Sequence, residues 1–208
     1  MTKITRIKQQ KDKNRVNIYL DDKFGFGVTL EELLKLGLKT DQELTDDQIK
    51  NIKEKDNKAK AYGNAIRFTT IRPRSEKEVE LWFKRKKIEG KTAKTVLQKL
   101  KKLELVNDLE FAKWWVEQRL QFRPKSKLAL KVELQQKGVD REITEQVLSQ
   151  VSPEGEEEMA RRIARKKLSR LSGLSEKKLK QKLTEYLARR GFSWNIIRNI
   201  VDSEYKKG

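Results

Sequence analysis

The tetrapeptide Arg72-Pro73-Arg74-Ser75 recurs 51 residues later as Arg123-Pro124-Lys125-Ser126. Extending this register brings apolar residues with helical spacing into alignment, and a further offset of 53 residues carries the pattern on to Val201. The aligned positions are Val79, Leu130 and Leu183; Phe83, Leu134 and Leu187; and Lys87, Gly138 and Gly191. A period near 50 residues with helical spacing indicates tandem helical modules. The repeat therefore predicts three three-helix modules in a row.

One stretch of the second module carries a conflicting pattern. Residues 128–134 place Leu or Val at every second position, which by itself is typical of a strand. The other two modules have helical spacing at the aligned positions, with Val79 and Phe83 in the first and Leu183 and Leu187 in the third. We therefore expect a helix in all three modules.

Capping residues mark where several of these helices begin and end. Ser75 and Glu78 have the spacing of a capping box, and Ser152-Pro153 has the pattern of an N-cap followed by the first helical residue. Gly138 and Gly191 fall just after a helix, where the backbone often turns left-handed. Such punctuation predicts short helices with defined ends.

The first 28 residues have the pattern of strands. Residues 16–20 and residues 24–28 alternate apolar and polar side chains, and residues 21–23 between them can form a turn. A third strand is expected to begin near Ile4. Because an isolated hairpin is marginally stable in water, this region should pack on another part of the chain.

Two capping boxes follow the hairpin region. Residues 29–32 open a short helix that ends at Gly37, and residues 45–48 open a long polar helix that could run toward Ile71. Residues 50–60 contain few apolar side chains. We therefore expect the first half of the long helix to be solvated.

Together these patterns predict a mainly α fold, in which a tandem array of three three-helix modules is preceded by a small N-terminal β-hairpin region. The expected boundaries are 1–44 for the hairpin and short helix, 45–106 for the first repeat, 107–152 for the second and 153–208 for the third.

The composition excludes several classes of protein. The 208 residues include no Cys and no His, so disulfides, thiolate zinc sites and the usual general base are missing. The sequence indicates no enzyme, no metal site and no cofactor. No apolar run approaches the roughly 18 residues of a membrane span, and the start lacks the apolar core of a signal peptide. We expect a cytoplasmic protein without membrane contact, and a monomer.

Charge is unevenly distributed along the chain. There are 50 Lys and Arg residues against 31 Asp and Glu residues, which gives a net charge of +19. Residues 57–106 carry +10 and residues 153–208 carry +7 of this excess. Such a surplus predicts attraction to a polyanion, with nucleic acid or a nucleoprotein as the favoured partner.

The corner between the first and second helix of each module is rich in cations and nearly free of acids. A solvated face would usually mix both signs, so these runs favour a basic contact surface, although three independent solvated faces are the alternative. The candidate contact residues are Arg67, Arg72, Arg74, Arg119, Arg123, Lys125, Lys127, Lys131, Arg161, Arg162, Arg165, Lys166, Lys167 and Arg170.

Other candidate sites have simpler explanations. Gly25-Phe26-Gly27 lies in a strand pattern and opens no long helix, so it is no nucleotide-binding loop. Residues 21–22, 46–47 and 156–158 are acidic, but they fit a turn and two helix starts. Exposed aromatics can stack on bases, yet most here fit a core. Trp114-Trp115 cannot face one direction on a helix, so one of them could contact a neighbouring module or a partner.

The repeat and its motifs resemble those of the RecX family, the bacterial regulators of RecA recombinase. The resemblance covers about residues 57–205, and the hairpin region looks like that of Gram-positive members. The motifs that carry it are Arg72-Pro-Arg-Ser75, Asp108-x-x-Phe111-Ala112-x-x-x-Val116-x-x-Arg119, Glu133-Leu134-x-x-Lys137-Gly138-Val139 and Leu187-x-x-x-Gly191-Phe192.

The resemblance implies a non-enzymatic protein that binds RecA and its filament on single-stranded DNA. RecX-like proteins lie along the filament groove and mostly inhibit the recombinase, ATPase and coprotease activities. The basic residues above would make the contacts, whereas the motif residues Asp108, Phe111, Ala112, Glu133, Leu134, Lys137, Gly138 and Gly191 are expected to be structural.

Two other readings stay open. A direct DNA-binding protein could affect RecA by competing for single strands, with double-stranded DNA as a second ligand, and its action would collapse with salt. A carboxylate-dependent nuclease would need acids that converge from separate elements, and nothing in the sequence indicates such convergence.

Overall fold

The structure is a computed structural model that describes residues 1–171 and 173–205. The chain divides into two compact units. One comprises Met1–Phe68 with Ile88–Val96, and the other comprises Thr69–Lys87 with Leu97–Gly208. This division runs through the expected first repeat, so the four-segment organisation stays a prediction.

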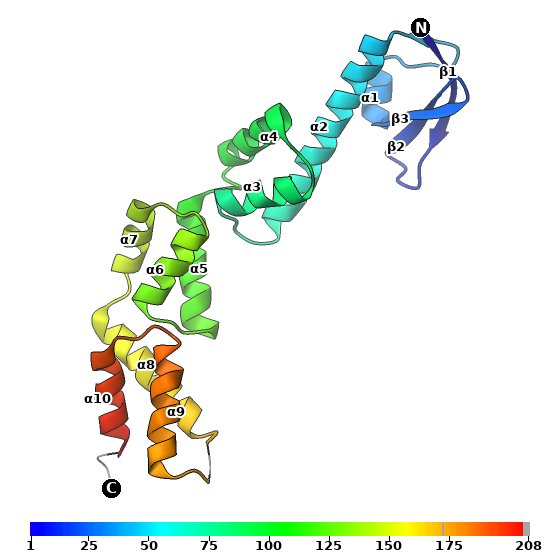
Figure 1. Ribbon diagram of the computed structural model, residues 1–208. Helices are drawn as coiled ribbons and strands as arrows, with labels where there is room; N and C mark the ends of the chain where they lie inside the picture. Colours follow the sequence, from blue (N-terminus) through cyan, green and yellow to red (C-terminus); the bar gives the residue numbers. More distant parts are fainter. Residues whose placement is uncertain (172, 206–208) are drawn as a thin grey trace. The chain divides into compact units, whose positions relative to one another are not determined.

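The first unit contains a four-stranded antiparallel sheet (Figure 1). The strands are β1 (Thr2–Gln9), β2 (Arg15–Leu20), β3 (Lys23–Thr29) and β4 (Glu43–Leu44), in the order β3-β2-β1-β4. The expected hairpin and third strand are confirmed. The turn residues Asp21 and Asp22 both have positive φ, as the tight turns of hairpins require. Strand β4 was not predicted, because a strand of two residues is too short to show a period.

One face of the sheet is covered by helical residues. Ile4, Ile18 and Val28 of the sheet are fully buried, and Ile52 belongs to the same apolar cluster. Helix α1 (Leu30–Lys35) begins with the expected capping box between Thr29 and Glu32. The hairpin region therefore has the packing partner that its marginal stability requires.

Helix α2 (Asp46–Thr70) begins with the expected capping box at residues 45–48. The expectation that its first half is solvated is wrong for one stripe. Ile52 is 7% exposed and Asp56 is 3% exposed. The Asp56 carboxylate accepts a hydrogen bond from Arg15 of β2 at 2.7 Å and pairs with Lys60 at 2.7 Å. Asp56 is therefore buried at a position where a periodicity analysis expects an apolar residue.

The rest of the described chain is helical, and the expected mainly α fold with three-helix modules is confirmed. The helices are α3 (Glu76–Arg85), α4 (Gly90–Lys102), α5 (Asp108–Phe122), α6 (Lys127–Gln136), α7 (Arg141–Ser149), α8 (Pro153–Leu168), α9 (Glu176–Ala188) and α10 (Trp194–Tyr205). Figure 1 shows α8, α9 and α10 as one group, and their apolar residues form one core. Residues of α5, α6 and α7 form another core.

Helix α6 resolves the conflicting pattern at residues 128–134 in favour of a helix. Leu130 and Leu134 are fully buried, whereas Leu128 is 68% exposed and Val132 is 45% exposed. The alternation arises because the helix has one apolar pair in the core, Leu130 and Leu134, and a second apolar pair on its exposed side. Position in the core, and not the period alone, separates the two pairs.

The aligned positions after the second helix of each module share one backbone conformation. Gly138 and Gly191 have φ values of 83° and 82°, as expected, and Lys87 has a φ of 55° without being glycine. The repeat therefore preserves the left-handed residue even where the side chain makes it unfavourable.

Candidate nucleic-acid and protein interface

The second unit contains two joints, one where α3 meets the second module and one where α6 meets the third module. In the first joint, Ser75 donates a hydrogen bond from its hydroxyl to the carbonyl of Lys137 at 2.7 Å. The N–H of Glu76 donates to the carboxylate of Asp108 at 2.8 Å. The start of α3 is therefore satisfied by groups of the second module as well as by its own cap.

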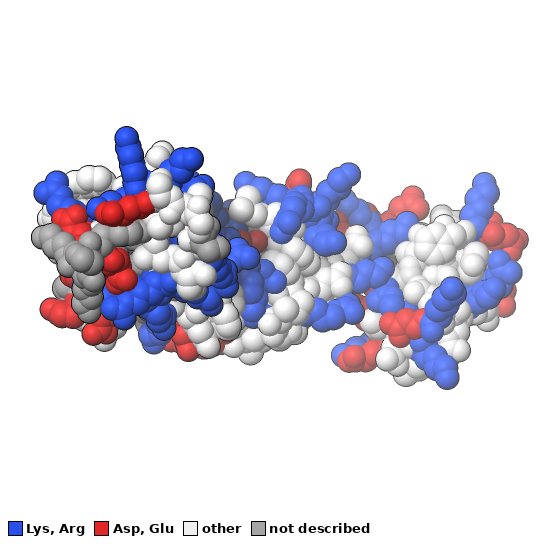
Figure 2. All heavy atoms as spheres, turned by 90° about the horizontal axis from the view of Figure 1, so that it is seen from below, with Lys and Arg blue, Asp and Glu red and all other residues white. Residues whose placement is uncertain are grey.

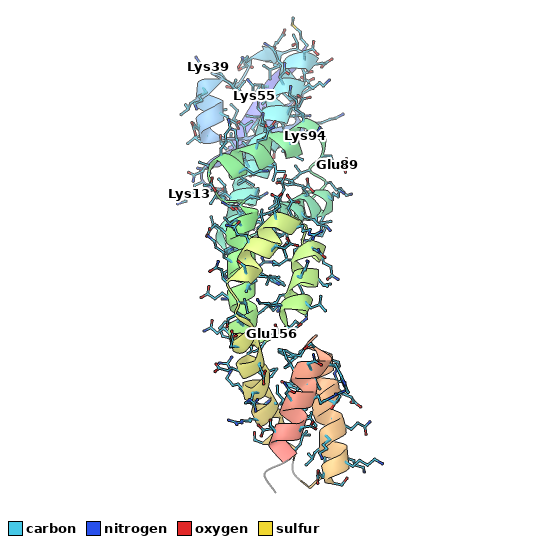
Figure 3. The ribbon with its side chains drawn as sticks, turned by 90° about the vertical axis from the view of Figure 1, so that its left-hand side faces the viewer. Lys13, Lys39, Lys55, Glu89, Lys94 and Glu156 are labelled. Carbon is cyan, nitrogen blue, oxygen red and sulfur yellow. The ribbon has the colours of Figure 1, made fainter. Side chains whose placement is uncertain are left out.

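The second joint repeats this arrangement with different residues. The N–H of Ser126 donates to the carbonyl of Arg190 at 3.0 Å, and the N–H of Lys127 donates to the carboxylate of Glu156 at 3.2 Å. Glu156 lies near the start of α8 (Figure 3). In both joints, an acid at the start of one module binds the free N–H groups at the start of the preceding second helix.

The two glycines belong to the joints as well as to helix ends. A methyl group on Gly138 would lie 2.6 Å from Cβ of Lys77, and one on Gly191 would lie 2.8 Å from Cβ of Ala129. Lys87, at the aligned position of the first module, is exposed. Glycine therefore stands where a neighbouring module approaches the backbone closely, and lysine is tolerated elsewhere.

The first joint also contains an ion-pair cluster around Glu78. Its carboxylate accepts hydrogen bonds from both terminal nitrogens of Arg72, at 2.9 and 3.1 Å, and from Lys137 at 2.7 Å. Burial by itself would raise the pKa of Glu78, but the bonds from Arg72 and Lys137 outweigh burial and hold this pKa below its ordinary value. The expected capping box at Ser75 is half correct, because Glu78 donates its N–H to Ser75 while its side chain binds these cations.

A second cluster surrounds Glu133 within the second module. Its carboxylate accepts hydrogen bonds from the Trp115 indole at 2.8 Å, from Arg119 at 2.7 Å and from Lys125 at 2.5 Å. Burial would raise the pKa of Glu133, and the bonds from Lys125, Arg119 and Trp115 lower it below its ordinary value. Arg119 and Lys125 therefore hold the second module together.

For two other charged groups near the first joint, burial outweighs the neighbouring contacts and disfavours the charged form. Burial raises the pKa of Asp108 despite the hydrogen bond from Glu76. Burial, together with the nearby Arg72, lowers the pKa of Arg74. Cations and acids are thus crowded at this joint, and their charges depend on one another.

The motif residues other than the cluster members are packing residues. Phe111, Ala112 and Leu134 are fully buried in the core of the second module. Leu120 packs against this core and against that of the third module. The fully buried Phe111, Ala112 and Leu134 position the surface and cannot reach a partner.

The predicted contact residues fall into an engaged group and a free group. The engaged ones have these partners besides the clusters above: Arg67 with Asn64, Lys131 with Glu145, Arg161 with Glu157 and Ser203, Arg165 with Glu204, and Lys167 with the Tyr186 ring. Lys127 takes part through its backbone N–H.

Within the described ranges, the side chains of four predicted cations have no ion pair, hydrogen bond or ring contact, namely those of Arg123, Arg162, Lys166 and Arg170. All four are exposed. Arg162, Lys166 and Arg170 recur every fourth residue, so they follow one side of α8 and its end. In the face drawn in Figure 2, Lys and Arg atoms outnumber Asp and Glu atoms. The charges of the four cations named above are therefore available to an external anion.

A groove of about 870 Å³ is lined by residues of α5, by residues of α7 and the segment that follows it, and by Arg162 of α8, which is one of these four cations. Its floor includes Val116, Leu120 and Val147, and its rim includes Lys113 and Glu117. An apolar floor with charged edges is suited to a protein segment.

The adjacent tryptophans face different neighbours, as expected for consecutive residues on a helix. The guanidinium of Arg72 lies 5.1 Å from the ring centre of Trp114, so Trp114 contacts the segment that precedes α3. Trp115 lies between Arg119 at 4.2 Å and Lys137 at 4.8 Å. Both rings are half-buried and serve internal packing.

One exposed pair of side chains, Trp194 and Arg198, was not predicted from the sequence. Trp194 is 58% exposed, and the guanidinium of Arg198 lies 5.9 Å from its ring centre. The signal was available, because Trp194 falls outside the apolar positions that align among the modules.

Across residues 1–171 and 173–205, no helix combines the length and apolar character needed to cross a bilayer. The same ranges contain no cluster of three or more Asp and Glu residues that could hold a metal ion.

Three family models match the chain. The N-terminal domain of regulatory protein RecX matches residues 2–45, the second three-helix domain of RecX matches residues 107–148, and its third three-helix domain matches residues 155–201. The two latter matches contain the members of the second joint, Ser126 and Gly191.

Curated relatives and solved structures agree with these matches. The chain is 35% identical to regulatory protein RecX of Listeria welshimeri, over 94% of this chain and 73% of the relative. It is 34% identical to that of Bacillus pumilus, over 99% of this chain and 78% of the relative. A crystal structure of regulatory protein RecX is similar with a TM-score of 0.67 and 30% identity, covering 97% of this chain and all of the other. RecX from Lactobacillus salivarius has a TM-score of 0.60 and 28% identity, covering 71% and 96%.

The relatives are regulatory proteins, which makes this chain a regulator and not an enzyme. The joints, the repeated helices and this similarity over nearly the whole length lead to one conclusion: the chain belongs to the RecX family of regulatory proteins.

Proposed function

We propose that this protein binds RecA and the RecA filament on single-stranded DNA, and that it mostly inhibits the recombinase, ATPase and coprotease activities. Family membership supports the partner, and the net charge of +19 supports a polyanionic target. A partner on DNA implies action in the cytoplasm. A monomer with several weak contacts would gain avidity from engaging neighbouring RecA subunits.

The observation that carries this proposal is the separation of the cations into engaged and free groups. Arg72, Arg119 and Lys125 have carboxylate partners inside the protein. Arg162, Lys166 and Arg170 have no acidic partner in the described ranges, and Arg162 also lines the groove of α5 and α7. We therefore assign filament contact to these residues and Arg123, and we assign the first group to the fold.

The second candidate function is direct competition for single-stranded DNA, which the large positive charge favours. The two mechanisms differ in stoichiometry. A competitor must cover the strand and is relieved by added DNA, whereas a filament modulator acts at far fewer copies than RecA.

The test is RecA's DNA-dependent ATP hydrolysis, titrated with this protein at two salt concentrations and with excess single-stranded DNA in one arm. We expect inhibition well below one copy per RecA that excess DNA does not relieve. Inhibition that requires coverage of the strand and disappears with added DNA would overturn the filament mechanism.

A charge-matched pair of variants assigns the contact. The triple variant R162Q, K166Q and R170Q should weaken inhibition by about 5- to 150-fold, because each phosphate contact is worth about 0.3 to 1 kcal/mol. The triple variant K8Q, K11Q and K39Q removes the same charge from exposed residues of the first unit. Equal losses in both would reduce the assignment to a general charge effect.

A further inference from the structure

The outward side of α10 carries an exposed aromatic residue that the proposed function does not use. Ile197 and Ile200 of α10 are buried in the core of the third module, whereas Trp194, Asn195, Arg198 and Asn199 are exposed. Trp194 is 58% exposed, and Arg198 lies beside its ring. A large flat side chain is thus open to solvent and has an arginine next to it.

The second module shows that this pair is not required by the fold. With the offset of 53 residues, Trp194 aligns with Arg141 and Arg198 aligns with Glu145. Arg141 and Glu145 form an ion pair at 2.7 Å, four residues apart on α7. The same two positions therefore hold an ordinary surface ion pair in one module and an aromatic–arginine pair in the other.

The aromatic–arginine pair leaves positive charge unneutralised. Glu145 neutralises Arg141 in the second module, whereas the ring of Trp194 leaves the charge of Arg198 intact. No acidic side chain of the described residues pairs with Arg198, although Asp202 lies one turn further along the helix. A guanidinium next to an indole face offers charge for a phosphate and a surface for a base.

We propose that Trp194, with Arg198 beside it, is a base-stacking site for single-stranded nucleic acid on the third module. This rests on the proposed function, of which it specifies one DNA contact. An unpaired base would stack on the indole, Arg198 would contact a neighbouring phosphate, and the amide side chains of Asn195 and Asn199 would be available for hydrogen bonds.

The surroundings favour nucleic acid over a protein partner at this site. Residues 153–208 carry a net charge of +7, so the module that holds Trp194 attracts a polyanion. An exposed tryptophan can also anchor a protein interface, but such anchors are usually surrounded by an apolar core. Here the exposed neighbours on α10 are Asn and Arg.

The experiment compares a fluorescein-labelled oligothymidylate with an abasic deoxyribose-phosphate strand of equal length, by anisotropy and without RecA. The wild type should bind the strand with bases more tightly. W194A should weaken binding to oligothymidylate by about 5- to 100-fold, leave binding to the abasic strand unchanged, and so lose the preference. W194F retains an aromatic ring and should keep part of the preference for the strand with bases.

Salt dependence separates the roles of the two residues. W194A removes no charge, so the slope of log affinity against log salt should not change, whereas R198Q should reduce the slope by about 0.7. Emission from Trp194 should be quenched by oligothymidylate in the wild type, and W194F should lose this quenching. L128A truncates a similarly exposed apolar residue of the second module and serves as the control.

Three outcomes would overturn the proposal: wild-type protein without a preference for bases, W194A with the preference intact, or W194A that binds DNA normally but no longer binds RecA. The last would make Trp194 a protein contact. The proposed function is tested by a different measurement: it fails if the wild-type protein leaves RecA's ATP hydrolysis unchanged.

Discussion

The two joints of the second unit have the same backbone arrangement and different chemistry. In each, the start of a second helix contacts the residue pair that ends the next module's second helix, Lys137-Gly138 or Arg190-Gly191. An acid of the following module accepts a backbone N–H in both, with Asp108 in the first and Glu156 in the second. Repetition therefore preserves backbone groups and the glycine.

The side-chain charges differ between the joints. Glu78 in the first joint binds Lys137 across the boundary, whereas the position aligned with Glu78 in the second joint is Ala129, which packs against Gly191. The aligned partner of Lys137 is Arg190, which binds Tyr186 within its own module. The comparison indicates that both joints share a close approach of backbone to a neighbouring module, whereas the ion pair across the boundary is found in the first joint.

The largest expected effect comes from filling the glycine position of the first joint. Gly138→Ala places a methyl group against Lys77 at a residue with a φ of 83°. We expect a loss of about 2–4 kcal/mol in the free energy of unfolding, from backbone strain and overpacking together. Gly173→Ala is the control, because Gly173 has a φ of 74° in the same unit with open space around it. It should lose only about 1–2 kcal/mol, and equal losses on urea denaturation would refute a joint-specific role.

A smaller effect is expected from making the first joint resemble the second. Glu78→Ala leaves the half-buried cations Arg72 and Lys137 without their acceptor. The expected loss is about 1–3 kcal/mol, because unsatisfied partners cost more than the bond contributes. The double variant E78A and K137M should recover part of this loss in a double-mutant cycle. A cycle without coupling would show that the ion pair does not stabilise the joint.

Acid should weaken the two glutamate clusters. The pKa values of Glu78 and Glu133 are lowered in the folded protein, so their contribution is complete above the ordinary value of about 4.3 and is lost as the pH falls through the lowered values. The loss of stability with acid, followed by circular dichroism, should be shallower in a variant with E78Q and E133Q.

Asp108 should act with the opposite sign in the same titration. Its pKa is raised in the folded protein, so protonation at falling pH favours the fold. D108N should therefore steepen the loss of stability with acid. An unchanged slope would show that burial of Asp108 does not affect its titration.

The smallest effect is expected at the aligned position without a joint. Lys87→Gly removes the strain of a left-handed lysine at an exposed residue. The gain should be below about 1 kcal/mol, because glycine also increases the entropy of the unfolded chain. Differential scanning calorimetry would detect this small increase in melting temperature. A large loss would mean that the Lys87 side chain makes a contact of its own.

Several features of this protein could be predicted from residues alone. The recurrence of Arg-Pro-Lys/Arg-Ser, the apolar positions aligned with Leu134 and the glycines after the helices were sufficient for the three-helix modules. The capping boxes at residues 29–32 and 45–48 were also correct. Helical spacing and capping boxes depend on neighbours three or four residues apart, so the local sequence contains these interactions in full.

Tertiary structure determined what the charged side chains do. Nothing near Asp56 in the sequence predicts that it is buried against Arg15, and nothing near Glu78 predicts that it leaves its capping box for Lys137. Likewise, the basic run at Arg119 and Lys125 resembles a contact surface until Glu133 folds against it. A charge can be neutralised by any residue that folding brings near, and that distance in space is not encoded in a local pattern.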